Sequence, residues 1–152
     1  MREPALIRML PDGRRMHLQD GPIDLIVEAN GSRGSVAAAY QAAARRFVSI
    51  LDELCAELPL LRSRVTSRSA KPRGTIARRM QAAVLPHRGT GFITPMAAVA
   101  GSVAEEVLAT MIEAALDRAY VINGGDIAIY LQDGHRYTIG MVERPDRPSV
   151  AL

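Results

Sequence analysis

The sequence predicts an α+β fold in which helices cover one face of a largely antiparallel sheet. Short alternating segments lie at both ends of the chain, helical periodicity lies between them, and turn signals rich in glycine or proline separate the predicted strands. The chain has 152 residues, of which 48% are apolar. This length allows one substantial hydrophobic core and excludes two full domains.

The first thirty residues predict three strands. Residues 6–10 and 14–18 flank Pro11-Asp12-Gly13, which is a turn signal, so we expect them to pair as a hairpin. A third strand over 23–29 follows Asp20-Gly21-Pro22, and one of its faces is more apolar than the other.

A long helix is the clearest element. Apolar residues recur every three or four positions from Val36 to Leu58, the period of a helix with one buried stripe. Ser35 is expected to cap the first turn, and Pro59 to end the helix. We therefore expect a helix over residues 36–57, with Cys55 as a buried, inert thiol.

Two more helices are predicted in the middle of the chain. Residues 60–74 read as a basic surface loop, and 75–84 as a short helix with Ile76, Met80 and Val84 inward. After a loop over 86–91, Thr94-Pro95 is typical of a helix start, which predicts a helix over 95–116. Ser102 and Glu105 form a capping-box pattern and offer an alternative start.

The last part of the chain predicts three more strands, over 120–123, 126–131 and 136–142. Gly124-Gly125 separates the first two, and Asp133-Gly134 is a strong hairpin signal before the third. The predicted order is therefore three strands, three helices and three strands.

The basic residues are unevenly distributed. Residues 58–104 contain no Asp or Glu and eight basic residues: Arg62, Arg64, Arg68, Lys71, Arg73, Arg78, Arg79 and Arg88. Phosphate or carboxylate ligands would be attracted to such a segment. It has no interleaved aromatic residues for stacking nucleic-acid bases, which disfavours nucleic acid as a partner and leaves a solvated surface as the alternative.

Several classes of site are excluded. A single cysteine rules out an internal disulfide and a cysteine-rich zinc site, and His17, His87 and His135 lack the spacing of metal ligands. No apolar run reaches the length of a membrane span, so no membrane partner is expected. The expected location is the cytoplasm.

Two segments are candidate ligand sites. In Asn123-Gly124-Gly125-Asp126, the glycines allow a ligand to approach the backbone, and Asp126 can bind a hydroxyl, a ring N–H or a metal; a β-bulge is the alternative. The segment with Thr94, Pro95, Met96, Ala97 and Gly101 forms an uncrowded helix start that can receive an anion such as a pyrophosphate. Close helix–sheet packing is the alternative there.

Four phrases of the sequence, over residues 21–25, 92–101, 121–127 and 137–141, together resemble an ApbE-like family related to ApbE, the FAD:protein FMN transferase. The resemblance implies an ApbE-like fold, with Thr94–Gly101 and Asn123–Asp126 beside FAD or its phosphates. It also implies magnesium, with its ligands outside this chain. The transferases carry a lysine where this chain has Ala100.

The resemblance predicts that residues 1–152 are one ApbE-like domain, truncated at the C-terminus, that binds a flavin nucleotide such as FAD or FMN. It identifies no catalytic residue, and transferase activity stays open. Two alternatives remain. One is a non-catalytic anion or nucleic-acid binding module that uses residues 62–88; the other is an inactive fragment whose exposed sheet edge forms a homodimer.

Overall fold

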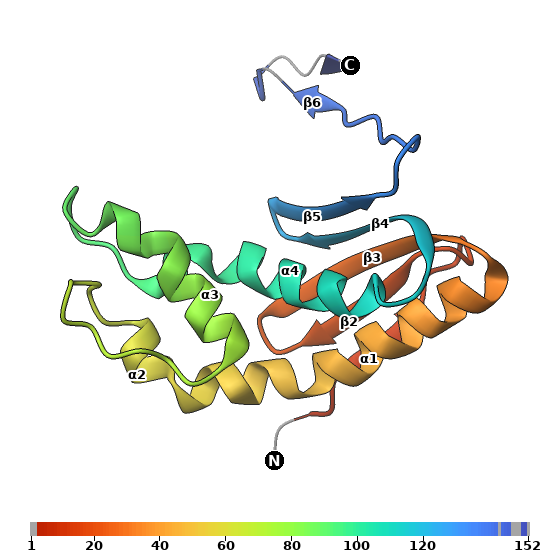
Figure 1. Ribbon diagram of the computed structural model, residues 1–152. Coiled ribbons are helices and arrows are strands. Elements are labelled where there is room, and N and C mark those ends of the chain that lie inside the picture. Colours follow the sequence, from red (N-terminus) through yellow and green to blue (C-terminus); the bar gives the residue numbers. More distant parts are fainter. Residues whose placement is uncertain (1–2, 143, 147–149, 152) are drawn as a thin grey trace.

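The computed structural model describes residues 3–142, 144–146 and 150–151 (Figure 1). Within these residues the main sheet has five strands in the order β1-β2-β3-β4-β5, and all neighbours are antiparallel. The strands are β1 (Leu6–Met9), β2 (Met16–Asp20), β3 (Ile23–Gly31), β4 (Leu116–Asn123) and β5 (Asp126–Leu131). The predicted α+β fold is confirmed.

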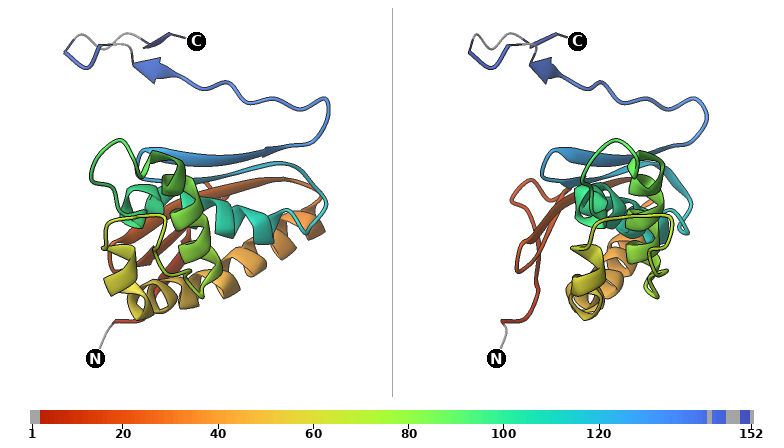
Figure 2. Two further views of the ribbon diagram at one scale, coloured as in Figure 1. Left: turned by 60° about the vertical axis from the view of Figure 1, so that its left-hand side comes forward. Right: turned by 90° about the vertical axis from the view of Figure 1, so that its left-hand side faces the viewer.

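Helices cover one face of this sheet (Figures 1 and 2). Helices α1 (Arg33–Ala56) and α4 (Val99–Met111) pack against the strands, and α3 (Thr75–Val84) packs on α4. Three short elements complete this layer: α2 (Leu58–Leu61) and the 3₁₀ helices η1 (Leu85–His87) and η2 (Pro95–Ala98). Among the described residues, no helix has the length and apolar character needed to cross a membrane.

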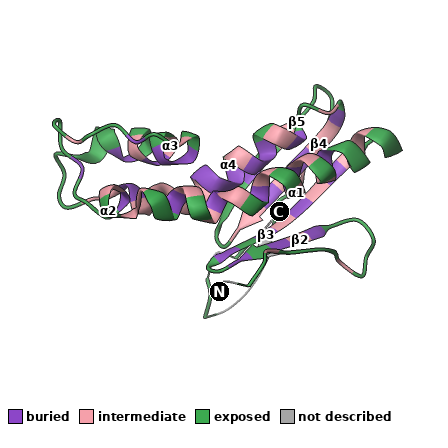
Figure 3. Ribbon diagram, turned by 90° about the horizontal axis from the view of Figure 1, so that it is seen from below, coloured by how far each residue is buried: buried purple, intermediate pink, exposed green. Residues whose placement is uncertain are grey.

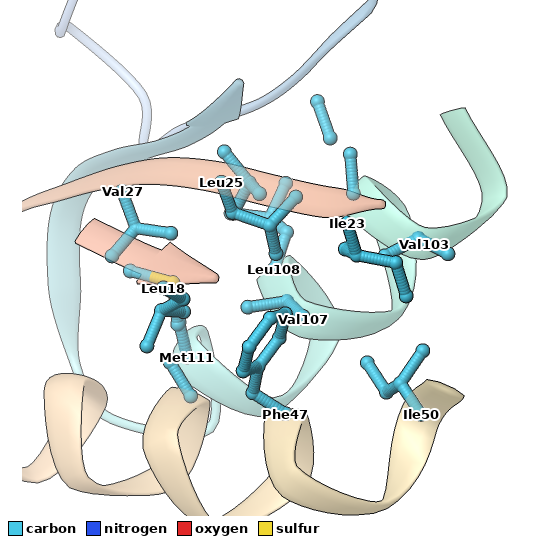
Figure 4. Close-up of a cluster of buried hydrophobic side chains, with 14 of the residues drawn as sticks. Leu18, Ile23, Leu25, Val27, Phe47, Ile50, Val103, Val107, Leu108 and Met111 are labelled. Atoms are coloured by element: carbon cyan, nitrogen blue, oxygen red, sulfur yellow. The ribbon is translucent and has the colours of Figure 1, made fainter. Parts of the chain in front are cut away.

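The core lies between the sheet and these helices, because each strand has one apolar face. In β3, Ile23, Leu25, Val27 and Ala29 are buried and alternate with more exposed residues. The buried stripes of the helices meet this face (Figure 3). Figure 4 shows the meeting point, where side chains from β2, β3, α1 and α4 interdigitate: Leu18, Leu25, Phe47, Ile50, Val107 and Met111.

A network of ion pairs fixes the three longer helices relative to one another. Arg46 of α1 donates from Nε to Glu106 Oε1 of α4 at 2.9 Å, and from Nη2 to Glu53 Oε2 at 2.7 Å. Arg79 of α3 donates from Nη1 to Glu106 Oε2 at 3.0 Å, and its Nε lies 3.1 Å from Glu105 Oε2. Glu106 therefore joins α4 to both α1 and α3.

The long helix begins three residues before the predicted start. Ser32, rather than Ser35, is its N-cap, because Ser32 Oγ accepts a hydrogen bond from the Ser35 N–H at 3.1 Å. The helix ends at Ala56, close to the predicted end. Pro59 lies in the first turn of α2, where its missing N–H has no cost, so the predicted loop over 60–74 begins only after Leu61.

The predicted helix over 95–116 is wrong at both ends. Its first turn is the 3₁₀ helix η2, and Ala98 has non-helical dihedral angles before α4 begins. Ser102 lies inside α4, so it is not a cap. The helix ends at Met111 because Leu116 pairs with Gly31 in the sheet, and this long-range pairing overrides the local apolar pattern.

The predicted return strand over 136–142 is also wrong. Within it only β6 (Met141–Val142) is a strand, and it pairs with β7 (Val150–Ala151) rather than with β5. Arg118 Nη1 donates to the Arg136 carbonyl at 2.8 Å, and Tyr137 packs edge-to-face on Tyr120. These contacts draw the chain over the sheet face that lies away from the helices, the outer face (Figure 2).

Two predictions about individual side chains have opposite outcomes. The helix α3 has the predicted bounds, and Ile76, Met80 and Val84 are buried as expected. In contrast, Cys55 is exposed. Its neighbour Leu54 occupies the buried stripe of α1, and one residue further the helix has turned by roughly a quarter of a revolution, away from the core.

Candidate functional site

The two predicted ligand segments meet at the first turn of α4. Asn123 Nδ2 donates a hydrogen bond to the Ala100 carbonyl at 3.1 Å. On the other side of the same turn, a Cβ atom added to Gly101 would lie 3.8 Å from Asp126 Oδ2. Residues far apart in the sequence are thus brought into contact, with Ala100 and Gly101 between two different pockets.

The larger pocket, of about 580 Å³, lies between α1 and α4, and we call it the α1–α4 cleft. Its volume is in the range of sites for small organic ligands. It is lined by the β2–β3 turn, the C-terminal half of α1, the α2 region, η2, the start of α4 and the end of β4: Gly21, Pro22, Ile23, Leu51, Leu54, Cys55, Leu58, Arg62, Met96, Val99, Ala100, Val103 and Asn123.

The shape of the cleft depends on Gly21. This residue has a φ of +54°, which other residues rarely adopt, and a Cβ atom there would lie 3.0 Å from Leu51 Cδ2. The turn between β2 and β3 can therefore approach α1 closely and form one wall. Most of the lining is apolar, and the few polar groups include the side chains of Arg62 and Asn123.

The smaller pocket, of about 270 Å³, contains Gly101 and Asp126 and is called the Asp126 pocket. Its other lining residues include Arg79, Ser102 and Glu105. Arg79 Nη1 donates to the Ser102 carbonyl at 3.1 Å in addition to its two ion pairs. The guanidinium that borders this pocket is thus already bound to carboxylates.

The other predicted residues lie around these pockets. Thr94 is the N-cap of η2, Pro95 is buried, and Ala97 is exposed. Gly124 and Gly125 form the exposed two-residue turn of the β4–β5 hairpin, in which Asn123 pairs with Asp126. Gly124 has a φ of +60°, as hairpin turns of this length require, and the ladder has no bulge here. Gly124 and Gly125 line neither the α1–α4 cleft nor the Asp126 pocket.

Of the nine predicted site residues, Met96 and Asn123 line the α1–α4 cleft, whereas Gly101 and Asp126 line the Asp126 pocket. The prediction missed the opposite wall of the cleft, formed by Gly21, Pro22 and the end of α1. The phrase over residues 21–25 belongs to the same family resemblance and could have indicated this wall.

The described residues offer no group of three or more His, Cys, Asp or Glu side chains placed to hold a metal ion. The basic residues of the middle segment are mostly exposed. Of the eight basic residues between positions 62 and 88, only Arg79 forms ion pairs with carboxylates in the described part of the chain. The other seven are exposed.

Comparison with known proteins adds one finding. The model of a protein family described as AbpE bacteria matches residues 7–152. No curated protein matches this chain.

Proposed function

We propose that this chain, which belongs to the AbpE bacteria family, is a flavin-nucleotide-binding protein related to the ApbE transferases, with its ligand in the α1–α4 cleft. The observation that carries this proposal is the contact between Asn123 and the Ala100 carbonyl. It joins the two segments that resemble the flavin site of ApbE at one wall of an apolar cleft of suitable size. The relation to the ApbE transferases rests on the sequence phrases.

The residues present suit a ligand with a flat apolar ring and an anionic end. Leu51, Leu54, Met96 and Val99 supply apolar walls, and small side chains such as Ala100 leave room between them. Arg62 supplies a positive charge that would attract the phosphate of FMN or FAD. Because no three acidic, histidine or cysteine side chains of the described residues converge on one point, we propose no metal-dependent step.

We propose binding rather than group transfer. Ala100 stands where the ApbE transferases carry a lysine, and it lines the cleft as an apolar wall. The proposed role of the flavin nucleotide is therefore that of a bound ligand, which the chain orients between α1 and α4 and shields partly from water.

The test is a thermal melt of the purified chain with and without FAD, FMN or riboflavin, followed by fluorescence titration of each flavin. A ligand at one hundred times its Kd should add about 2.7 kcal/mol to the free energy of unfolding. Ala100→Leu should fill the cleft and weaken flavin binding at least tenfold. Ala97→Leu is the matched control, because Ala97 is exposed and does not line the cleft.

A second pair of variants tests the anionic end. Arg62→Gln should weaken FMN more than riboflavin, which lacks the phosphate, whereas Arg64→Gln, outside the cleft, should weaken neither. Absence of flavin binding in the wild type, or equal binding by Ala100→Leu and Ala97→Leu in folded protein, would contradict the proposal.

A second candidate function is anion binding by the basic segment. Its support is the set of seven exposed cations that form no ion pair with described carboxylates: Arg62, Arg64, Arg68, Lys71, Arg73, Arg78 and Arg88. If the segment has this function, its affinity for a polyanion such as single-stranded RNA should fall steeply as the salt concentration rises. Affinity that is constant from low to high salt would exclude it.

We also propose a cytoplasmic location, supported by the single cysteine, which leaves no internal disulfide to form. Fractionation of cells that express the tagged chain would test this, and recovery in the periplasmic or secreted fraction would contradict it.

A further inference from the structure

The free edge of β5 has no strand partner within the described part of the chain. β5 pairs with β4 alone, and the chain that follows crosses the outer face instead of returning along the edge. In an antiparallel sheet, alternate residues of an edge strand direct their N–H and C=O groups away from the neighbouring strand. β5 therefore presents a row of backbone groups to a further strand.

The two edges of the sheet differ in how they are protected. β1 has four residues, follows Pro4 and carries Arg8, and these are features that disfavour strand addition. β5 has six residues, no proline and a single charge, Asp126, at its first position. The side chains of Ile127, Ile129 and Leu131 are all exposed on the outer face. The β5 edge thus has the character of an interface.

We propose that β5 pairs with β5 of a second copy of this chain, antiparallel about a two-fold axis at Ile129. In this register Ile127 faces Leu131 of the other copy, and Ile129 faces Ile129, so every outer-face pair is apolar. On the inner face, the small Ala128 meets the large Tyr130. Asp126 faces Gln132, so no like charges oppose each other.

Neighbouring registers are less favourable. Residues that oppose each other on paired strands must point to the same face of the sheet. The two-fold axis can therefore lie only at a residue of β5, never between two residues. An axis at Tyr130 sets two tyrosines opposite each other, and an axis at Ala128 sets Asp126 opposite Tyr130 and Leu131 opposite Gly125. The register at Ile129 creates one continuous sheet through both copies, with the helices of both copies on the same face.

Sedimentation velocity over a range of protein concentrations measures this association. Ile129→Lys places two ammonium groups opposite each other at the axis and should weaken dimerisation at least tenfold. Leu6→Lys is the matched control on the other edge strand, because Leu6 is 40% exposed and Ile129 is 39% exposed. The control variant should dimerise like the wild type, and melting curves should show that both variants are folded.

Chemical cross-linking tests the register. In a Cys55→Ser background, Ile129→Cys places two thiols directly opposite each other, whereas the two thiols of Ile127→Cys lie four residues apart along the strands, about 13 Å. A thiol cross-linker too short for that distance should join only the Ile129→Cys variant. A wild type that stays monomeric, a dimer that Ile129→Lys leaves intact, or equal cross-linking of both cysteine variants would overturn the proposal.

Discussion

The carboxylate of Glu53 on α1 makes the stability of the helical layer depend on pH. Hydrogen bonds from the Arg46 guanidinium, and another from Ser49 Oγ, hold the pKa of Glu53 below its ordinary value of 4.5, against the opposing effect of partial burial. Because the pKa of Glu53 is lower in the folded chain, its carboxylate stabilises the fold at pH values above the ordinary pKa of 4.5. This contribution is lost as the pH falls through the pKa of the folded state.

We therefore expect the free energy of unfolding to fall as the pH decreases below about 4.5, and to fall less steeply in Glu53→Gln. Urea denaturation at a series of pH values measures both slopes. Glu113→Gln is the control, because Glu113 is exposed and forms no ion pair with the described residues. Identical slopes for wild type and Glu53→Gln would show that the Arg46 pair does not affect stability.

At the scale of elements, the start of α3 is held by a residue outside that helix. Gly74, its N-cap, has no side chain, and Glu57 instead holds the backbone at the entrance to the helix: Glu57 Oε2 accepts from the Arg73 N–H and Glu57 Oε1 from the Gly74 N–H, both at 2.7 Å. A carboxylate at this position also interacts favourably with the helix dipole.

Removal of this carboxylate should weaken α3 locally. Glu57→Ala should cost about 1 kcal/mol, the usual effect of losing a helix cap. Hydrogen exchange should show faster exchange in the first turn of α3, with little change in the middle of α1. Uniformly faster exchange throughout the protein would instead indicate that Glu57 stabilises the whole fold rather than this helix start.

Elements that local spacing determines could be predicted from the sequence, and elements that distant contacts determine could not. The bounds of α3 and β5 follow from their own periodicity. The return strand over 136–142 also has a strand pattern, but contacts with Arg118 and Tyr120 place it over the outer face. A pattern within one segment contains no information about such partners.

The same distinction applies to the candidate site. The resemblance predicted the segments that contain Met96 and Asn123, because their small and polar residues stand out in the sequence. The opposite wall contains ordinary core residues such as Leu51 and Leu54, and only the packing of α1 against the β2–β3 turn brings them to the cleft.

For the molecule as a whole, stability depends on one core shared by the sheet and the helices. Phe47 of α1 is fully buried at its centre (Figure 4). Phe47→Ala should lower the free energy of unfolding by about 3–5 kcal/mol, a large part of the total for a domain of this size. Val48→Ala is the matched control, because Val48 is the next residue on the same helix and is 48% exposed.

Chemical denaturation followed by circular dichroism and by tyrosine fluorescence measures both variants. We expect Val48→Ala to stay within about 0.5 kcal/mol of the wild type. If the two substitutions had similar costs, the core would not lie where the burial pattern places it.

The order of the strands also has a consequence for folding kinetics. β1, β2 and β3 form a local meander, β4 and β5 form a hairpin, and in the sheet the β3–β4 ladder joins the two. The hydrogen bond from Tyr120 to Glu28 in that ladder connects residues 92 positions apart. The meander and the hairpin close short loops at low entropic cost, whereas the β3–β4 ladder closes a long loop that contains all the helices. In chain order α1 follows the first three strands directly, so during synthesis it is the first helix available to cover their apolar face, whereas β4 follows all the helices.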